Sequence, residues 1–167
     1  TLISDTIQSH VKTNTSYMRV NKKASTLDVI IPGRDPEQTI SAAVAVDVSG
    51  SISEVLARDF LSEVMGLMKQ FVDFKIELWC FDTVVMNYKK FDQYNLEELY
   101  SYEIPNGGGT SFECNWEYMR KNNIEPKMFI MLTDGLPNAG WGEPNYCDTV
   151  FIINNTSEIV PPFGRYA

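Results

Sequence analysis

Short apolar runs alternate along the chain with segments whose apolar residues recur at helical spacing. Two of these runs, residues 41–46 and 127–134, are strongly apolar, and each is closed by an aspartate. Runs of this kind are typical of strands buried on both faces in the middle of a sheet. We therefore expect two central strands, with Asp47 and Asp134 at their carboxyl ends.

The segment between these runs is predicted to contain one long helix and a pair of strands. Residues 53–71 carry apolar side chains at helical spacing, with a serine available to cap the amino end. Residues 75–81 and 84–91 have the pattern of two strands joined by a tight turn. We expect these strands to be antiparallel, and the more polar second strand to lie nearer an edge of the sheet.

The rest of the chain supplies further elements of both kinds. The pattern predicts, in order, a helical or irregular stretch over 95–102, a glycine-rich loop over 105–110, a helix over 112–122, a long loop over 135–147 and a strand over 148–153. Strands that alternate with helices imply a mainly parallel sheet with right-handed crossovers. The expected fold class is therefore α/β: a three-layer, Rossmann-like fold with a mainly parallel central sheet, one antiparallel strand, and helices on both faces.

The amino-terminal part of the chain has a different character. Residues 2–11 are expected to form a short helix, and the polar segment up to residue 38, with its prolines and glycine, an irregular wrap. Residues 39–167 are expected to form the main domain. A chain of 167 residues with 44% apolar content suits one structural domain overall.

Charge and composition narrow the classes of partner. The net charge of -8 creates a field that repels nucleic acid phosphates and anionic lipids. No apolar run approaches the roughly 20 residues needed to span a bilayer, and the first residues lack the order of a signal peptide. The three cysteines lack metal-type spacing and fit a reducing compartment. We expect a cytoplasmic protein that binds neither nucleic acid nor membrane.

Polar residues follow both central strands, where ligands bind in open α/β sheets. The first strand ends in Asp47-Val48-Ser49-Gly50-Ser51, the glycine-rich loop supplies Thr110, and the second strand ends at Asp134. This set resembles the metal-ion-dependent adhesion site of von Willebrand factor A (VWA) domains, an Asp-x-Ser-x-Ser motif with a loop threonine and a strand-end aspartate. The resemblance implies direct coordination of a cation by the two serines and the threonine, and coordination by the aspartates either directly or through water.

The chemistry of these side chains favours a hard cation. Magnesium prefers about six oxygen ligands and keeps several waters, so hydroxyls beside two carboxylates suit it, as they would manganese or calcium. Softer metals do not fit, because no cysteine or histidine joins the set. The alternative is that each part has only a local structural role: Ser49 or Ser51 as a helix cap, Asp134 as part of a turn, and the glycines as a flexible loop. Their joint occurrence at strand ends favours the metal site.

A narrower resemblance covers nearly the whole chain. The segments AVDVSGSIS, FDT, GGGTSF, MLTDG and PPFGR occur in this order. They are similar to the VWA-like carboxyl-terminal domain of predicted zinc metallopeptidases of bacteria and their phages. In that family an amino-terminal peptidase module carries a His-Glu-x-x-His helix. The only histidine here is His10, so this chain lacks the peptidase chemistry.

Other catalytic sites also lack essential residues. A haloacid dehalogenase-like phosphatase needs a second aspartate where Ser49 stands, a serine or cysteine hydrolase needs a base, and the glycine-rich loop lacks the lysine of a phosphate-binding loop. We therefore expect no enzymatic activity from this chain. Asp82 is expected to stabilise a turn and not to bind metal. Trp141 and Tyr146 are expected to pack beneath the loop after Asp134 or to form an aromatic rim for a partner.

Two functions remain open. The first is a metal-ion-dependent protein-interaction module, in which a partner's aspartate or glutamate binds the cation. The second is a regulatory or accessory domain of a larger metallopeptidase with a structural metal. Relatives often work beside AAA+ ATPases, so an AAA+ ATPase is one partner that the resemblance implies.

Overall fold

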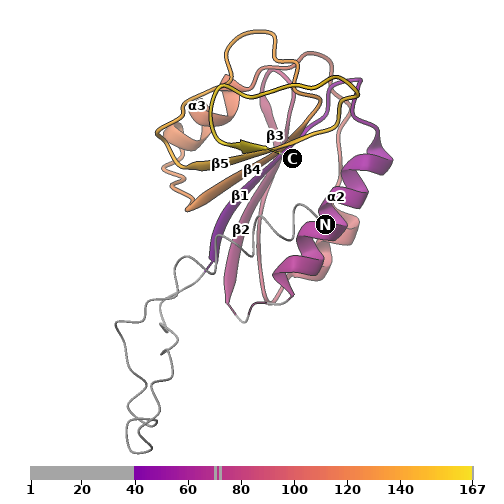
Figure 1. The fold of residues 1–167 in the computed structure, drawn as a ribbon. Helices are drawn as coiled ribbons and strands as arrows, with labels where there is room; N and C mark the ends of the chain where they lie inside the picture. Colours follow the sequence, from indigo (N-terminus) through magenta and orange to yellow (C-terminus); the bar gives the residue numbers. More distant parts are fainter. Residues whose placement is uncertain (1–39, 70, 72, 167) are drawn as a thin grey trace, which may run out of the picture. The chain divides into compact units, whose positions relative to one another are not determined.

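The strands of the described part of the chain form a six-stranded sheet in the order β3-β2-β1-β4-β5-β6 (Figure 1). The computed structural model describes residues 40–69, 71 and 73–166, so the expected amino-terminal helix and wrap lie outside the described residues. The strands are β1 (Ile40–Asp47), β2 (Phe74–Phe81), β3 (Val85–Asp92), β4 (Met128–Thr133), β5 (Asp148–Ile153) and β6 (Arg165–Tyr166). The helices of this part of the chain are α2 (Glu54–Met68), the 3-10 helix η2 (Leu96–Ser101) and α3 (Glu113–Lys121).

Strand β1 lies in the middle of the sheet, parallel to β2 on one side and to β4 on the other. Only the β2–β3 pair is antiparallel, and β3 is an edge strand. Val46 aligns with Leu132, so β1 and β4 end side by side. These pairings confirm the predicted mainly parallel sheet with one antiparallel strand, and they show that the strands closed by Asp47 and Asp134 are neighbours.

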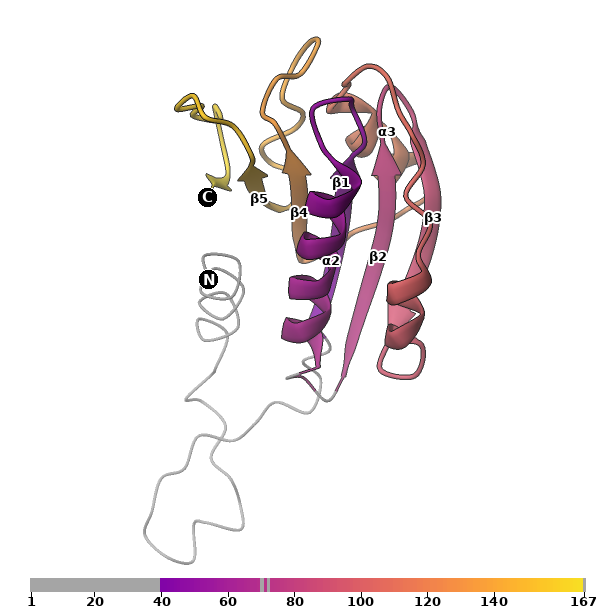
Figure 2. The ribbon, with the colours of Figure 1, turned by 90° about the vertical axis from the view of Figure 1, so that its right-hand side faces the viewer.

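Helices cover both faces of the sheet. Helix α2 lies on one face and α3 on the opposite face, as the two views in Figure 1 and Figure 2 show. Because successive side chains of a strand point to opposite faces, Ala43 and Ala45 face one layer and Val44 the other, and all three are completely buried. On the α3 face the buried core consists of Ala43, Ala45, Trp79, Phe81, Phe112, Trp116, Met119, Ile124, Phe129, Met131 and Phe151. Small residues of β1 leave room there for the large aromatic rings.

Some element boundaries differ from the predicted ones. Helix α2 ends at Met68 and not at residue 71, because the Phe71 amide donates to the Met68 carbonyl in a tighter turn. The stretch before the glycine-rich loop is a 3-10 helix. Strand β6 was not predicted, since two residues are too few to show an alternating pattern. Among the helices described, none is long and apolar enough to cross a bilayer.

The buried ring of Phe129 offers a test of this core. Its centroid lies 5.8 Å from that of Trp79 and 5.2 Å from that of Trp116. Phe129→Ala should lower the free energy of unfolding by about 3–5 kcal/mol, because a cavity would form between the two indoles. Tyr94→Ala, at a side chain that is 88% exposed, should change it by less than about 0.5 kcal/mol. Urea unfolding followed by circular dichroism measures both, and equal effects would contradict the packing described.

Candidate metal centre

The ends of β1 and β4 meet at the point where the chain changes direction across the sheet. From β1 the chain crosses one face through α2 to β2, and it reaches β4 on the other side of β1 through α3 on the opposite face. Such a switch point leaves a crevice beyond the carboxyl ends of the two strands, where ligands bind in open α/β sheets. Asp47 and Asp134 stand at this crevice.

Asp47 is completely buried, and both of its carboxylate oxygens accept hydrogen bonds. The Ser49 amide donates to Oδ1 at 2.8 Å, and the Thr133 hydroxyl, from the end of β4, donates to Oδ2 at 2.8 Å. Thr133 in turn accepts a hydrogen bond from the Gly135 amide at 3.1 Å. The Thr133 side chain thus connects the carboxylate of one strand to the loop that follows the next.

A chain of hydroxyl groups joins the two strand ends on the solvent side. Ser51 Oγ donates to Asp134 Oδ2 at 2.5 Å, and the Ser49 and Ser51 oxygens lie 3.0 Å apart. Because the Ser51 proton is directed to Asp134, Ser51 can only accept in its contact with Ser49. The other Asp134 oxygen, Oδ1, accepts from the Leu136 amide at 3.0 Å.

The glycine-rich loop lies against the ends of β1 and β2 and carries Thr110. The Gly107 amide donates to the Val48 carbonyl at 3.1 Å, and a Cβ on Gly107 would lie 2.6 Å from that oxygen, so only glycine fits. Thr110 is buried, and its carbonyl accepts from the Asn138 amide at 2.8 Å. The loop is therefore tied to both sides of the crevice.

Hydrogen bonds connect four of the five predicted ligands: Asp47, Ser49, Ser51 and Asp134. The Asp47 carboxylate is joined to this set by the Ser49 amide. The negative charges of Asp47 and Asp134 repel each other. Thr110 is connected through its backbone to the loop that follows Asp134. The ligand assignment itself stays a prediction.

The electrostatics of the centre favour a bound cation. Burial raises the pKa of the Asp47 carboxyl above its ordinary value, the donors Ser49 and Thr133 act against this, and the nearby Asp134 charge raises it further. A dication would stabilise both carboxylates in their charged form. Within the described residues, no three histidine, cysteine or carboxylate side chains are grouped as a metal site. A cation here would therefore use hydroxyl oxygens beside the two aspartates, which suits magnesium better than zinc.

Three residues that support the centre were not singled out as such from the sequence. Thr133 lies inside the strand-end motif but gave no sign of its role, which depends on the register of β4 against β1. The Asn155 side chain donates to the Asp134 carbonyl at 2.9 Å, a contact between residues far apart in the sequence. Asp82 forms the turn that was predicted for it, but its second carboxylate oxygen also accepts from the Gly108 amide at 3.3 Å.

The aromatic residues of the long loop pack inward. The Trp141 ring lies against Phe112 and Phe151, with centroid distances of 5.3 and 5.2 Å, and the Tyr146 hydroxyl donates to the Ile124 carbonyl at 2.8 Å. Packing beneath the loop, the first of the two predicted alternatives, is therefore confirmed for both side chains.

The bond between Thr133 and Asp47 can be tested by a nearly isosteric change. Thr133→Val keeps the shape and the strand preference of the side chain but leaves a buried carboxylate oxygen without its donor. It should lower the free energy of unfolding by about 1–3 kcal/mol in metal-free buffer. Thr133→Ser, which keeps the hydroxyl, should lose less. Denaturant unfolding measures the difference, and a valine variant as stable as wild type would show that the bond contributes nothing.

Comparison with protein families identifies the fold family of this chain. The chain matches the family described as VWA-like domain (DUF2201) over residues 42–167. No curated protein matches it. Among solved structures, the chain is similar to an uncharacterized membrane spanning protein from Vibrio fischeri, with 19% sequence identity and a TM-score of 0.38, over 67% of this chain and 70% of that chain. Because this family match covers most of the chain, including both strand ends at the crevice, the chain belongs to the VWA-like domain family.

Proposed function

We propose that this domain is a metal-ion-dependent protein-interaction module. One divalent cation, magnesium or manganese, would be held by Asp47, Ser49, Ser51, Thr110 and Asp134, and an aspartate or glutamate of a partner protein would complete its coordination. The observation that carries the proposal is the hydroxyl chain from Ser49 through Ser51 to Asp134, beside the buried Asp47 at the switch point of the sheet.

The donor set suits such a cation in number and kind. Serine and threonine hydroxyls are neutral oxygen donors, and the two aspartates supply the charge that balances a dication. When one aspartate lies behind a water, the cation keeps more of its positive charge. A carboxylate from another chain then binds in a charge-assisted contact at the remaining position.

The described loops around the two aspartates supply no positively charged side chain to balance them. The loops at the carboxyl edge of the sheet, residues 48–53, 82–84, 102–112 and 134–147, contain no lysine or arginine. Buried or crowded carboxylates are ordinarily paired with a cation or protonated. A bound dication is therefore the natural partner of this carboxylate pair.

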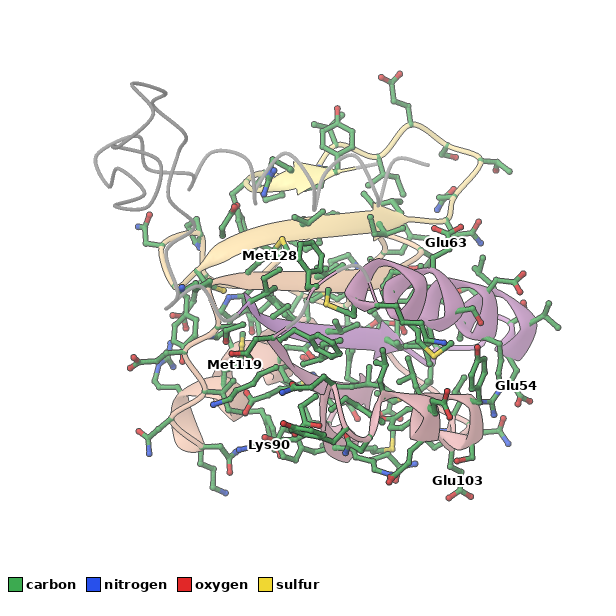
Figure 3. The ribbon with its side chains drawn as sticks, turned by 90° about the horizontal axis from the view of Figure 1, so that it is seen from below. Glu54, Glu63, Lys90, Glu103, Met119 and Met128 are labelled. Atoms are coloured by element: carbon green, nitrogen blue, oxygen red, sulfur yellow. The ribbon has the colours of Figure 1, made fainter. Side chains whose placement is uncertain are left out.

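A pocket beside Asp47 leaves space next to the proposed cation. Its volume is about 190 Å³, and it lies between the amino end of α2 and the glycine-rich loop, with Ser49, Glu54 and Asn106 among its lining residues. Figure 3 shows Glu54 and Glu103 at one end of the molecule, with Met128, at the start of β4, toward the other. A segment of a partner that reaches the cation would find room for a neighbouring side chain here.

We also propose a cytoplasmic location and a class of partner protein for this domain. The three cysteines, Cys80, Cys114 and Cys147, form no disulfide, and burial raises the pKa of each thiol, which lowers the thiolate fraction at neutral pH and suits the reducing cytoplasm that we propose. An AAA+ ATPase is the partner class that the family resemblance implies.

The metal site is tested by titrating the metal-free domain with Mn²⁺ and following binding by calorimetry and electron paramagnetic resonance. Wild type should bind one ion. Asp47→Ala and Thr110→Ala should each weaken the affinity at least tenfold, because each removes an oxygen donor that the cation needs. Ser62→Ala, at an exposed serine on α2 whose hydroxyl donates to the Arg58 carbonyl, serves as the matched control and should bind as wild type does. A wild-type protein that binds no Mn²⁺ would refute the metal site.

The interaction is tested by pull-down from the native host in magnesium and in EDTA, followed by calorimetry on the recovered protein. Binding should require the cation and should be lost in Asp47→Ala while Ser62→Ala retains it, because the partner's carboxylate binds the ion itself. Equal affinity in EDTA, or in the Asp47→Ala protein, would place the interface elsewhere and leave the cation a structural role at most.

The proposal also predicts an absence of catalysis by this chain. Its only histidine, His10, lies outside the described residues, and the metal centre has no histidine ligand and no activated nucleophile. The purified chain should therefore hydrolyse neither casein nor p-nitrophenyl phosphate in the presence of magnesium. Turnover that Asp47→Ala abolishes would identify an enzyme in place of a binding module.

A further inference from the structure

Asp82 touches the glycine-rich loop on both sides of Thr110. Asp82 follows β2, and its Oδ2 accepts from the Gly108 amide at 3.3 Å. Its backbone carbonyl accepts from the Ser111 amide at 2.7 Å. One residue at the end of β2 thus holds the loop two positions before Thr110 and one position after it.

The same carboxylate is itself held rigidly by the turn between β2 and β3. Oδ1 accepts from the Val84 amide at 3.0 Å and from the Thr83 amide. Partial burial acts to raise the pKa of the Asp82 carboxyl, but these amides and that of Gly108 outweigh it, and the pKa is lowered. The contact with Gly108 is therefore charge-assisted at neutral pH, which strengthens it relative to a contact between neutral groups.

Close contacts leave the loop little freedom to find another path. A Cβ on Gly109 would lie 2.9 Å from the Thr83 methyl group, and Gly107 lies directly against the Val48 carbonyl. The loop is therefore pressed onto the turn that Asp82 organises. The position of Thr110 depends on these contacts, because one residue separates it from the anchored Gly108 amide and the anchored Ser111 amide follows it directly.

We propose that Asp82 is a positioning residue that sets Thr110 for the cation, acting through the Gly108 and Ser111 amides without touching the ion. The inference rests on the proposed metal site. The Asp82 carboxylate then has a second role besides its turn, because the turn uses Oδ1 whereas Oδ2 is directed at the loop. Outer residues that orient a metal ligand commonly contribute ten- to a hundredfold in affinity.

Asp82→Asn separates these two tasks. The asparagine oxygen can still accept from the turn amides, whereas its NH₂ group cannot accept from Gly108. The variant should keep the turn and lose the loop contact. Asp82→Ser is a second variant with the same purpose, because a serine hydroxyl supports a similar turn but is too short to reach Gly108.

The test is a double-mutant cycle on Mn²⁺ affinity, measured by calorimetry for wild type, Asp82→Asn, Thr110→Ala and the double variant. Asp82→Asn alone should weaken the affinity about tenfold. In the Thr110→Ala background it should change the affinity less than about twofold, because a residue that acts through Thr110 has nothing left to position. A merely structural role would instead give equal losses in both backgrounds.

Asp92→Asn is the matched control. Asp92 also accepts a backbone amide in a turn, that of Tyr94 at 2.8 Å, but at the end of β3, which runs antiparallel to β2 and so ends at the other edge of the sheet. Its affinity for Mn²⁺ should equal that of wild type. Amide hydrogen exchange without metal should show faster exchange of the Gly108 amide in Asp82→Asn, and unchanged exchange there in Asp92→Asn.

The outcomes separate the two proposals. Wild type that binds no Mn²⁺ overturns both the metal site and the positioning role. Wild type that binds, with additive losses in the cycle or with full affinity in Asp82→Asn and Asp82→Ser, overturns the positioning role alone and leaves the metal site standing. Coupled losses together with faster exchange of the Gly108 amide support it.

Discussion

The hydrogen bond from the Thr133 hydroxyl to the buried Asp47 carboxylate links the two strands on which this end of the molecule depends. A carboxylate without exposure to solvent is costly unless its oxygens are satisfied, and here the neighbouring strand and the following turn satisfy them. The same bond orients the loop after β4 through Gly135. This buried polar contact therefore connects the register of β4 against β1 with the turn after each strand.

The aromatic core and the proposed metal ligands lie in different parts of this fold. Below the crevice, large rings such as Trp79 and Phe129 fill the space that the small residues of β1 leave, and they give the sheet a rigid aromatic core. Above it, polar groups are held by backbone amides from loops. A rigid base with loops at one edge allows ligand groups to be positioned accurately although none of them lies within a helix or in the middle of a strand.

Much of this architecture could be predicted from residue pattern alone, because buried parallel strands are nearly continuous apolar runs. The two central runs are each closed by an aspartate, Asp47 at the end of β1 and Asp134 directly after β4. The β2–β3 pair could be predicted from the polar second strand, and the ends of the elements to within a few residues. The roles of Thr133 and Asn155 could not, since both contacts join residues far apart in the sequence and depend on strand register. Asp82 was predicted as a turn residue from its local motif, whereas its contact with Gly108 depends on how the loop folds back.

The close approach of Gly107 to Val48 bears on how such domains can diverge. Any side chain at position 107 would meet the Val48 carbonyl, so the loop cannot change its composition there without moving away from β1. Variation around the crevice is thereby directed to its other side, where the side chains of Leu136 and Ala139 are exposed. A designer who wishes to alter the proposed interaction would diversify that segment and leave Gly107 unchanged.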